Sequence, residues 1–496
     1  MSAPYRLRRQ RVSTTSPGPS FLDRYFSITA RGSTMRREIR GGLVTFFTMA
    51  YIVVLNPIII GGSPDIHHNV LGSAPVAAGT ALVAAVMSVL MGGIGRYPFA
   101  LATGLGLNAF IAGNVARQMT WPEAMGLVVC EGIIITALVL TGFRTAVVHA
   151  IPAQLKTAIG VGIGLFIALI GFVDAGVVRR IPDVAKTTVP LQWGTTGTGS
   201  LNSWPEFVFV IGLILMAALV ALRVKGAILI GIIVNTILAI IVEKLAKAGP
   251  AVDAKGAHPS GWALNVPSWP HKVADRPDLK LLGHFSLAGG FERIGVVAAL
   301  LIVFSLMLSD FFDTMGTVVG VAKEGDLLDS QGNLPGIGPV LFVDSVAAMA
   351  GGAASVSSNT TYVESAAGVG DGARTGLASI VTGLLFVVAM FLSPLVAVVP
   401  SEAAAPALVV VGTLMIAQVR DLDLTDFSVA VPAFLTMVLM PFTYSITVGI
   451  GAGVVSYVVL RTVKGGARGI HPLLWLVALL FVAYFAIDPI RNAAGV

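Results

Sequence analysis

The sequence lacks features that several large classes of protein require. It has one cysteine in 496 residues, Cys130, and this excludes a disulfide framework. Charged residues make up 12% of the chain, whereas soluble domains average about 25%. The basic, polar N-terminus, MSAPYRLRRQRVSTTSPGPS, has no apolar stretch of the kind found in a secretory signal peptide. The composition is therefore unlike that of a secreted disulfide-rich domain or of a soluble protein.

Motifs for enzymatic or nucleotide-driven chemistry are also missing. His67 and His68 lack the spaced partner residues that a zinc site needs. The glycine-rich run at 160–171 lacks the Lys-Ser/Thr ending of a phosphate-binding loop and lies inside an apolar stretch, so helix packing explains its glycines. We find no nucleophile paired with a base and no nucleotide-binding domain. The sequence predicts neither an enzyme nor a protein that uses a cofactor or a metal.

The chain is instead rich in long apolar runs. Hydrophobic residues make up 55% of it, and the mean hydropathy is +0.86. The runs are roughly 17–25 residues long, the length that crosses a bilayer core as a helix. We predict an all-α polytopic membrane protein with fourteen transmembrane segments, near 41–61, 75–95, 98–112, 122–143, 153–174, 206–222, 226–243, 294–321, 339–354, 357–370, 374–399, 405–420, 427–441 and 443–461. A further apolar run at 471–487 is either an interfacial helix or a fifteenth span.

The basic residues indicate the orientation of the spans. The net charge of +6 could suggest a nucleic-acid partner, but the positive residues flank apolar segments, as topology signals do. If the N-terminal tail 1–40 is cytoplasmic, the short loops after even-numbered spans should be basic. They contain Arg96, Arg144, Lys156, Arg223, Lys225, Lys323, Arg374, Arg420, Arg461, Lys464 and Arg468, while an outer loop holds the exceptions Arg179, Arg180 and Lys186. We therefore expect no nucleic-acid partner. We also expect the polar stretch 244–293 to be extracellular.

The two halves of the chain share a plan. Seven spans per half make the second half inverted relative to the first, as in secondary transporters with a midplane binding site. The third span of each half contains small and polar residues: PFALATGLGLNAFIAGNVA at 98–116 and AASVSSNTTYVESAAGVG at 353–370. Irregular backbone is tolerated at this depth only where protein or water surrounds it. We predict a short strand and then a half-helix in each, with free N–H groups at the helix starts facing a ligand.

Three acidic residues, Asp310, Asp313 and Glu364, lie within predicted spans of the second half. A carboxylate at mid-membrane costs at least roughly 2.5–3.5 kcal/mol, so its default interpretation is functional. Asp310 and Asp313 are three residues apart and share a helical face. Carboxyl groups that converge in a low-dielectric site cannot all ionise, so one of them can carry a proton. The alternative is that backbone and Ser/Thr groups satisfy these acids, which then only hold helices together.

Two other polar residues lie in apolar surroundings. Asn108 follows Gly104 and Gly106 and can both donate and accept hydrogen bonds, which suits the edge of a planar ligand. It could instead join two helices. For Glu131, in VVCEGIII, helix packing is the preferred interpretation.

Several motifs together resemble the nucleobase–cation symporters, in particular their adenine/guanine/hypoxanthine permease branch. The motifs are GGLVTFFTMAYIVVLNPIII, GLGLNAF, AIGVGIGLFIALIG, DFFDTMGTVVGVAKEG and TTYVESAAGV, in this order between about residues 35 and 461. The resemblance implies a core domain, 41–143 and 294–399, that carries substrate, and a gate domain, 153–243 and 405–461. It also implies elevator-type, proton-coupled uptake of purine bases across the plasma membrane and a homodimer formed through the gate domain. The C-terminal segment 462–496 lies outside the resemblance.

The resemblance also assigns a site. It places substrate-binding acids at Asp313 and Glu364, a polar partner at Asn108 beside Gly106, and a second acid, for proton coupling with Asp313, at Asp310. Gly104 and Thr361 lie in the same two motifs, Thr103 directly precedes the first of them, and these three residues complete the predicted binding set. The chain departs from the branch at Thr103, where Pro is commoner, and at 357–359, so its preference among hypoxanthine, guanine and adenine stays open. A facilitator without coupling and an anion carrier of the same architecture are the alternatives, although carboxylates argue against an anion.

Overall fold

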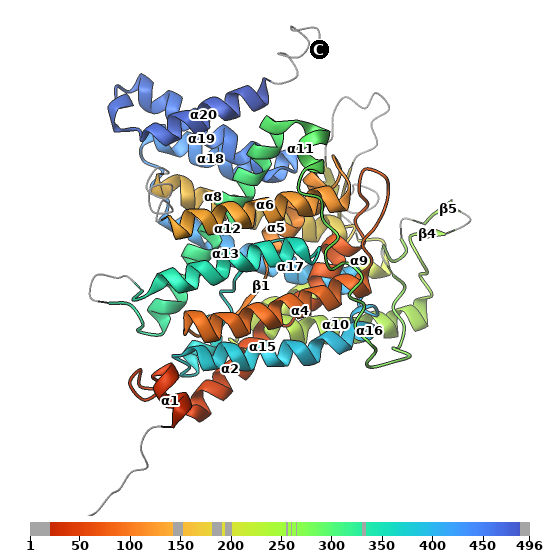
Figure 1. Cartoon of the computed structure of the whole chain (residues 1–496). Coiled ribbons are helices and arrows are strands. Elements are labelled where there is room, and N and C mark those ends of the chain that lie inside the picture. Colours follow the sequence, from red (N-terminus) through yellow and green to blue (C-terminus); the bar gives the residue numbers. More distant parts are fainter. Residues whose placement is uncertain are drawn as a thin grey trace, which may run out of the picture.

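The computed structural model of the chain describes residues 20–141, 152–180, 191–193, 201–253, 256–258, 260–263, 265–329 and 334–486. Ten helices in these residues are long and apolar enough to cross a membrane: Met35–Gly61, Ser73–Gly95, Trp121–Leu140, Ala153–Asp174, Trp204–Ala221, Ala227–Ala246, Val296–Glu324, Gly376–Val396, Ser401–Asp421 and Ile446–Val463. Figure 1 shows the long helices side by side, with connecting segments at both ends. The prediction of a helical multi-pass membrane protein is confirmed. The count of fourteen spans and the inverted repeat stay predictions.

The first half of the described chain contains the following elements. They are α1 (Phe21–Phe26), α2 (Met35–Met49), α3 (Ile52–Asn56), the π-helical turn η1 (Pro57–Gly61), α4 (Ser73–Leu90), η2 (Met91–Gly95), β1 (Leu101–Thr103), α5 (Leu105–Phe110), η3 (Ile111–Val115), α6 (Trp121–Leu140), α8 (Ala153–Asp174), β2 (Val178–Arg180), β3 (Leu191–Trp193), α9 (Trp204–Ala221), α10 (Ala227–Ala246), β4 (Val252–Asp253) and β5 (Gly256–Ala257).

The second half follows with a similar alternation of long and short helices. Its elements are α11 (Gly289–Ile294), α12 (Val296–Glu324), α13 (Ile337–Ala353), β6 (Asn359–Thr361), α14 (Ser365–Gly370), α15 (Gly376–Ala389), the 3₁₀ turn η4 (Met390–Leu392), α16 (Ser393–Val396), α17 (Ser401–Ile416), η5 (Ala417–Asp421), α18 (Phe427–Thr443), α19 (Ile446–Val463), η6 (Ala467–Gly469) and α20 (Pro472–Phe485).

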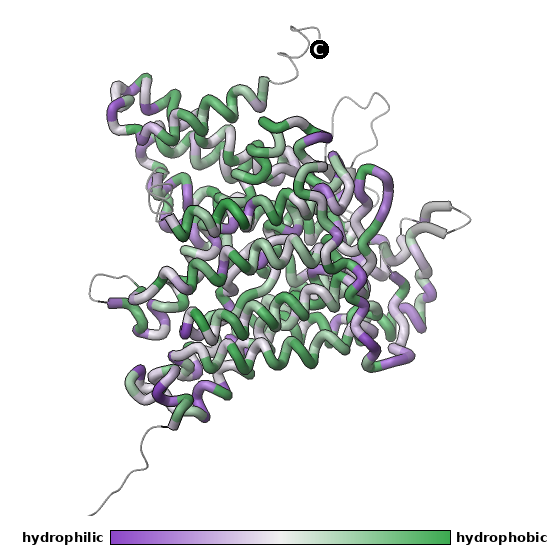
Figure 2. The backbone as a smooth tube through the Cα atoms, in the orientation of Figure 1, coloured by the Kyte–Doolittle hydropathy of each residue, from purple (hydrophilic) through white to green (hydrophobic). Residues whose placement is uncertain are grey.

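The surface of the bundle matches a lipid environment. Polar residues concentrate at the helix ends and in the connecting segments, while the middles of the helices are mostly apolar (Figure 2). Large apolar side chains lie exposed on these middles, as Ile214 does at 64% and Leu384 at 57%. Such surface is unfavourable in water and favourable against acyl chains. The bundle is therefore apolar outside, and its buried polar residues need partners inside it.

A two-stranded ribbon lies between the long helices. β1 and β6 pair antiparallel, with Leu101 opposite Thr361, Ala102 opposite Thr360 and Thr103 opposite Asn359. Backbone hydrogen bonds extend the pairing at both ends: Gly104 N–H donates to Ser358 O (3.0 Å) and Tyr362 N–H to Ala100 O (2.9 Å). Non-helical backbone inside a bilayer must find its partners within the protein. The predicted strands before the two short helices are present, and each completes the other.

The short helices leave this ribbon in different ways. α5 begins directly after Gly104 and continues into η3, whereas α14 ends after six residues at Asp371. Asp371 forms ion pairs with Arg40 of α2 (2.6 Å) and with Lys225, which lies between α9 and α10. The hydrogen bond from Lys225 is the main reason that the pKa of Asp371 lies below its usual value. This interaction stabilises the fold above the ordinary carboxyl pKa and is lost as the pH falls through the lowered value.

The apolar run at 471–487 forms a helix over its described part. α20 packs against α19 and α12, and Phe481 is fully buried there. The rings of Phe481 and Phe304 lie 6.3 Å apart. At 14 residues, α20 is shorter than a typical span, so whether this segment crosses the membrane stays open.

One glycine controls the approach of α13 to the turn before β6. A Cβ atom on Gly351 would lie 2.0 Å from Ser357 O, a backbone atom that cannot move away easily. We expect Gly351→Ala to destabilise the protein by roughly 1–3 kcal/mol, the usual range for overpacking. A lower midpoint of thermal unfolding in detergent would show this. Gly93→Ala is the matched control, because a Cβ at Gly93 meets nothing within 4 Å; equal midpoints for the two variants would contradict the prediction.

Candidate functional site

Asp313 and Glu364 lie together near the middle of the bundle. Asp313 is on α12, and Glu364 is the residue that precedes the first turn of α14. Asp313 is exposed to solvent and Glu364 is half-buried, although both are densely surrounded by protein atoms. Each lies within Coulombic range of the other. Solvent therefore reaches the two predicted binding acids, although protein surrounds them.

A tyrosine that sequence reasoning did not single out holds Glu364 in place. The Tyr51 hydroxyl donates a hydrogen bond to Glu364 Oε1, and Thr48 Oγ1 donates to Glu364 O (3.4 Å). A second phenol, that of Tyr362, donates to Thr103 O (2.7 Å) and also lies within Coulombic range of Glu364 and Asp313. Tyr51 belongs to the motif TMAYIVVLNP, and its position among apolar residues is the only sequence signal that marked it.

Thr103 and Asn108 are less accessible than Asp313 and Glu364, because both side chains are fully buried. Thr103 Oγ1 lies 2.7 Å from Val356 O and 2.5 Å from Asn108 Oδ1, and its single hydroxyl proton is shared between these two acceptors, which ties the strand to the first turn of α5. Asn108 Nδ2 has no hydrogen-bond partner among the described residues. Direct contact of Thr103 or Asn108 with a ligand stays a prediction.

The expectation of free N–H groups at the helix starts is wrong in two places. The Gly104 N–H donates to Ser358 O and belongs to the ribbon. At the start of α14, the N–H groups of Ser365, Ala366 and Ala367 donate to the carbonyls of Tyr362, Val363 and Glu364. The turn that leads into α14 thus consumes the donors that a free helix end would offer.

Gly106 has a packing role that its sequence position did not reveal. A Cβ atom there would lie 2.5 Å from Ile163 Cγ2 of α8. The absence of a side chain lets α5 contact α8, a helix of the predicted gate domain. Ligand contact by Gly106 or Gly104 stays a prediction.

The sequence did not identify a third carboxyl group, Asp344 of α13, which bonds to residues near the two accessible acids. It is fully buried, and Oδ1 accepts hydrogen bonds from Thr361 N (3.1 Å) and Thr361 Oγ1 (3.0 Å). Oδ2 accepts from Thr314 Oγ1 (2.7 Å), which also contacts Thr360 Oγ1 (2.6 Å). Asp344 therefore connects α12, α13 and β6. Thr361 bonds to this buried acid, and its predicted ligand contact remains untested.

Asp310 and Asp313 have different environments despite their helical spacing. Asp310 is fully buried, whereas Asp313 is solvent-exposed. The carboxyl groups that act on Asp313 are those of Asp344 and Glu364. Glu364 and the buried Asp344 are thus within Coulombic range of the accessible Asp313.

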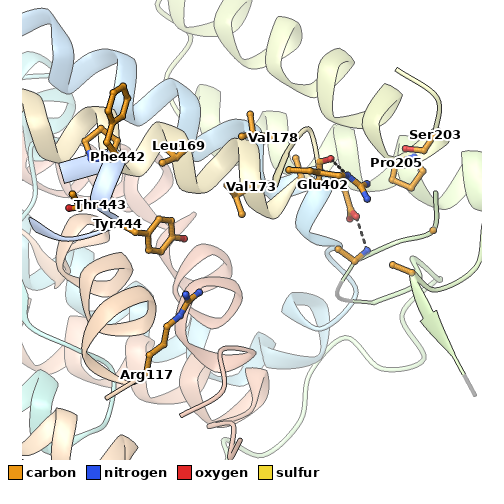
Figure 3. A pocket seen from close by; sticks show the side chains of 17 residues that line it. Arg117, Leu169, Val173, Val178, Ser203, Pro205, Glu402, Phe442, Thr443 and Tyr444 are labelled. Atoms are coloured by element: carbon orange, nitrogen blue, oxygen red, sulfur yellow. Dashed lines mark hydrogen bonds between the residues drawn. The ribbon is translucent and has the colours of Figure 1, made fainter. Parts of the chain in front are cut away.

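A separate cavity of about 710 Å³ lies at the ends of α8, α17 and α18. Figure 3 shows Arg117 extending toward the ring of Tyr444 at one side of it and Glu402 at the other. The Arg117 guanidinium carbon is 5.5 Å from the centre of the Tyr444 ring. No predicted binding residue is among the described residues that line this cavity. Likewise, the described part of the chain contains no group of three or more His, Cys, Asp or Glu side chains placed to hold a metal ion.

Bilayer-length helices around buried carboxyl groups and a strand-interrupted centre define the class of membrane transporters. Residues 36–452 match the Permease family, and the chain belongs to this family. It is a permease and not an enzyme. The guanine/hypoxanthine permease PbuG of Bacillus subtilis is 37% identical over 93% of this chain and 98% of its own length. The adenine permease AdeP of Escherichia coli is 36% identical over 95% and 97%.

Solved structures share the fold at low sequence identity. The transmembrane domain of the cyanobacterial bicarbonate transporter BicA superposes with a TM-score of 0.59 at 14% identity, over 85% of this chain and 97% of that one. Murine Slc26a9, an anion transporter in an inward-facing state, gives 0.58 at 11% identity, over 92% and 74%. These likenesses concern the fold alone.

The hydrogen bonds of Asp344 predict how its variants behave. Asp344→Ala should destabilise the protein by about 1–3 kcal/mol for each buried donor left unpaired. Asp344→Asn should retain most of the stability, because its amide oxygen can still accept from Thr361 and its NH₂ group can donate to the Thr314 hydroxyl. Thermal unfolding in detergent would compare the two variants. An Asn variant as unstable as the Ala variant would show that the charge, rather than the hydrogen bonds, matters.

Proposed function

We propose that the protein is a proton-coupled symporter that takes up the purine nucleobases hypoxanthine, guanine and adenine across the plasma membrane. The observation that carries this proposal is the pair Asp313 and Glu364, two solvent-accessible acids within Coulombic range of each other in a permease fold. The relatives that align over nearly the whole chain are named as guanine/hypoxanthine and adenine permeases. An anion carrier is disfavoured, because a pocket with two carboxyl groups repels anions.

A purine suits this pair of acids. Its flat ring carries adjacent N–H donors and N or O acceptors, and Glu364 and Asp313 can accept hydrogen bonds from ring and exocyclic N–H groups. Tyr51 fixes the Glu364 carboxylate through its hydroxyl, and the Asn108 amide has an unpaired Nδ2 group. A site built from buried polar groups rejects analogues that leave one of them unpaired. The selectivity of the transporter follows from that penalty.

The proton has a physical role in this scheme. Carboxyl groups that converge inside a bilayer cannot all ionise, so one of the acids, Asp310 or Asp313, carries the proton. It also removes a charge that the moving domain would otherwise carry through a low-dielectric region. The proton gradient is then the only energy source, and no cofactor takes part.

The domain arrangement is part of the proposal. Fourteen segments form an inverted repeat, with the core at 41–143 and 294–399 and the gate at 153–243 and 405–461. The ribbon of β1 and β6 joins the two halves within the core, which favours movement of the core as one body in an elevator mechanism. The N-terminus is cytoplasmic, and the gate domain forms a homodimer contact.

Uptake measurements test the proposal. Radiolabelled hypoxanthine, guanine, adenine, xanthine and uracil are offered to cells without their own permeases, with and without an uncoupler. We expect uncoupler-sensitive accumulation of the first three bases and none of xanthine or uracil. Uptake that does not change with the uncoupler or with the external pH would contradict proton coupling and favour a facilitator.

Two variants separate binding from coupling. Glu364→Ala should abolish nucleobase binding, because the acceptor for the ring N–H is lost and Tyr51 is left unpaired. Asp310→Asn should keep some binding while weakening the pH dependence of uptake. Both are measured as uptake and as substrate-induced thermal stabilisation of the purified protein. Normal uptake by Glu364→Ala would refute the site assignment.

A further inference from the structure

A buried glutamate outside the proposed substrate site has no structural explanation as a packing residue alone. Glu131 lies on α6, where α6 and α13 approach closely; a Cβ on Gly132 would lie 2.4 Å from Met349 N. Glu131 is fully buried, and Oε1 accepts a long hydrogen bond from Ser358 Oγ (3.4 Å). Oε2 has no hydrogen-bond partner within the described residues. Leaving one buried carboxyl oxygen without a partner is costly, and packing alone does not account for it.

Unpaired polar atoms continue from Glu131 along the turn that precedes and enters β6. Ser357 Oγ and both amide atoms of Asn359 are fully buried and find no partner in the described ranges of the chain. Ser358, between them, is the residue that contacts Glu131. Buried polar atoms are normally satisfied by protein or by ordered water. Residues 357–359 and Glu131 thus provide the several polar partners that bound water molecules need.

The buried polar residues around Glu131 lie between the predicted extracellular segment and the proposed substrate site. Toward the segment 244–293, which we predict is extracellular, Ser355 Oγ donates to His284 O (3.0 Å). Toward the substrate site, Glu131 lies within Coulombic range of Asp344, and Asp344 lies within Coulombic range of Asp313. Asp344 also bonds to Thr314, the residue after Asp313. Three carboxyl groups, Glu131, Asp344 and Asp313, therefore form a series that leads inward from the loop side.

We propose that Glu131 and Asp344, with water bound at residues 357–359, relay the coupling proton from the extracellular side to Asp313. This inference rests on the proposed proton symport and names its route. A hydronium ion gives its proton to the Glu131 carboxylate and leaves as water. The Glu131 carboxyl group passes the proton through bound water to the Asp344 carboxylate, and Asp344 passes it to Asp313. Glu131 and Asp344 end as carboxylates, so one proton has moved and no electrons have.

The charges around the relay suit this role. α6 packs against α13, α12 and α11. The titratable groups on these helices are Asp344 on α13, Asp310, Asp313, Lys323 and Glu324 on α12, and Glu292 and Arg293 on α11. Glu364, Tyr51 and Tyr362 lie within Coulombic range of Asp313. Arg293 is engaged by Glu123 at the end of α6 (2.6 Å). The neighbours of the relay acids are thus mainly acids, which lets a proton be shared along the series.

The test separates proton delivery from substrate handling. Purified protein in liposomes is assayed for hypoxanthine uptake driven by an imposed pH gradient, acidic outside, and for counterflow at equal pH. Glu131→Gln keeps the size of the side chain and a contact for Ser358 but cannot carry a proton. We expect gradient-driven uptake to fall by at least about tenfold while counterflow changes by less than about twofold, because counterflow lets the loaded carrier return without releasing its proton.

Further variants distinguish a loss of proton transfer from a loss of folding. Glu131→Asp should restore the pH dependence, since it can titrate, and Ser358→Ala should lower the ratio of gradient-driven to counterflow rates by removing the hydroxyl next to Glu131. Glu402→Gln is the matched control: it is equally buried, accepts from Ala263 N (2.8 Å) and Ser401 Oγ (3.1 Å), and lies on α17 away from the relay. Its ratio should equal that of the wild type.

The outcomes are distinct. A wild-type protein that transports hypoxanthine without response to the pH gradient would overturn both the proposed symport and the relay. A pH-driven wild type whose Glu131→Gln and Ser358→Ala variants keep the wild-type ratio would overturn the relay alone. Equal losses in gradient-driven uptake and counterflow would likewise assign Glu131 to structure rather than to proton transfer.

Discussion

The pairing of β1 with β6 is the interaction on which the rest of this structure depends. Inside a bilayer, an extended backbone has no water to bond with, so each of these three-residue strands is tolerable only because the other completes its hydrogen bonds. The strands lie more than 250 residues apart in the sequence. Their pairing brings α5 and α14 to one place and sets Thr103, Asn108 and Glu364 close to α12. The acids Asp313 and Glu364 come together because two otherwise unstable segments stabilise each other.

A second layer of polar residues supports the accessible acids. Tyr51 fixes Glu364, and Asp344 fixes Thr361 and Thr314. Such a layer has two consequences in a low-dielectric interior, where hydrogen bonds and repulsion between like charges are both strengthened. It holds the acids in a defined geometry, and it places further titratable groups within reach of them. Substrate recognition and proton movement can therefore share one network.

Membership of the Permease family and the fold likeness to BicA and Slc26a9 bear on different questions. The family relatives align over nearly the whole chain at above 30% identity, and their names concern purines. The solved structures share an architecture with anion carriers at 14% identity or less, and the chemistry of the central site differs from what an anion needs. The solved structures thus concern the fold alone, transport follows from membership of the family, and the ligand of Asp313 and Glu364 belongs to the proposed function.

The sequence by itself determined the class of protein and the position of its central acids. Helix length and hydropathy are local properties, and a carboxylate within an apolar run is conspicuous because its burial is unfavourable. It also indicated the two strands, because Gly, Ser and Thr cluster where helices would otherwise continue. Only the tertiary structure decided that the Gly104 N–H belongs to the ribbon and that Gly106 faces Ile163. It also decided that Asp310 is buried while Asp313 is accessible. Finally, it placed Tyr51 against Glu364 and Asp344 against Thr361. Each of these depends on which face of a distant element is the neighbour, and no local pattern in the chain carries that information.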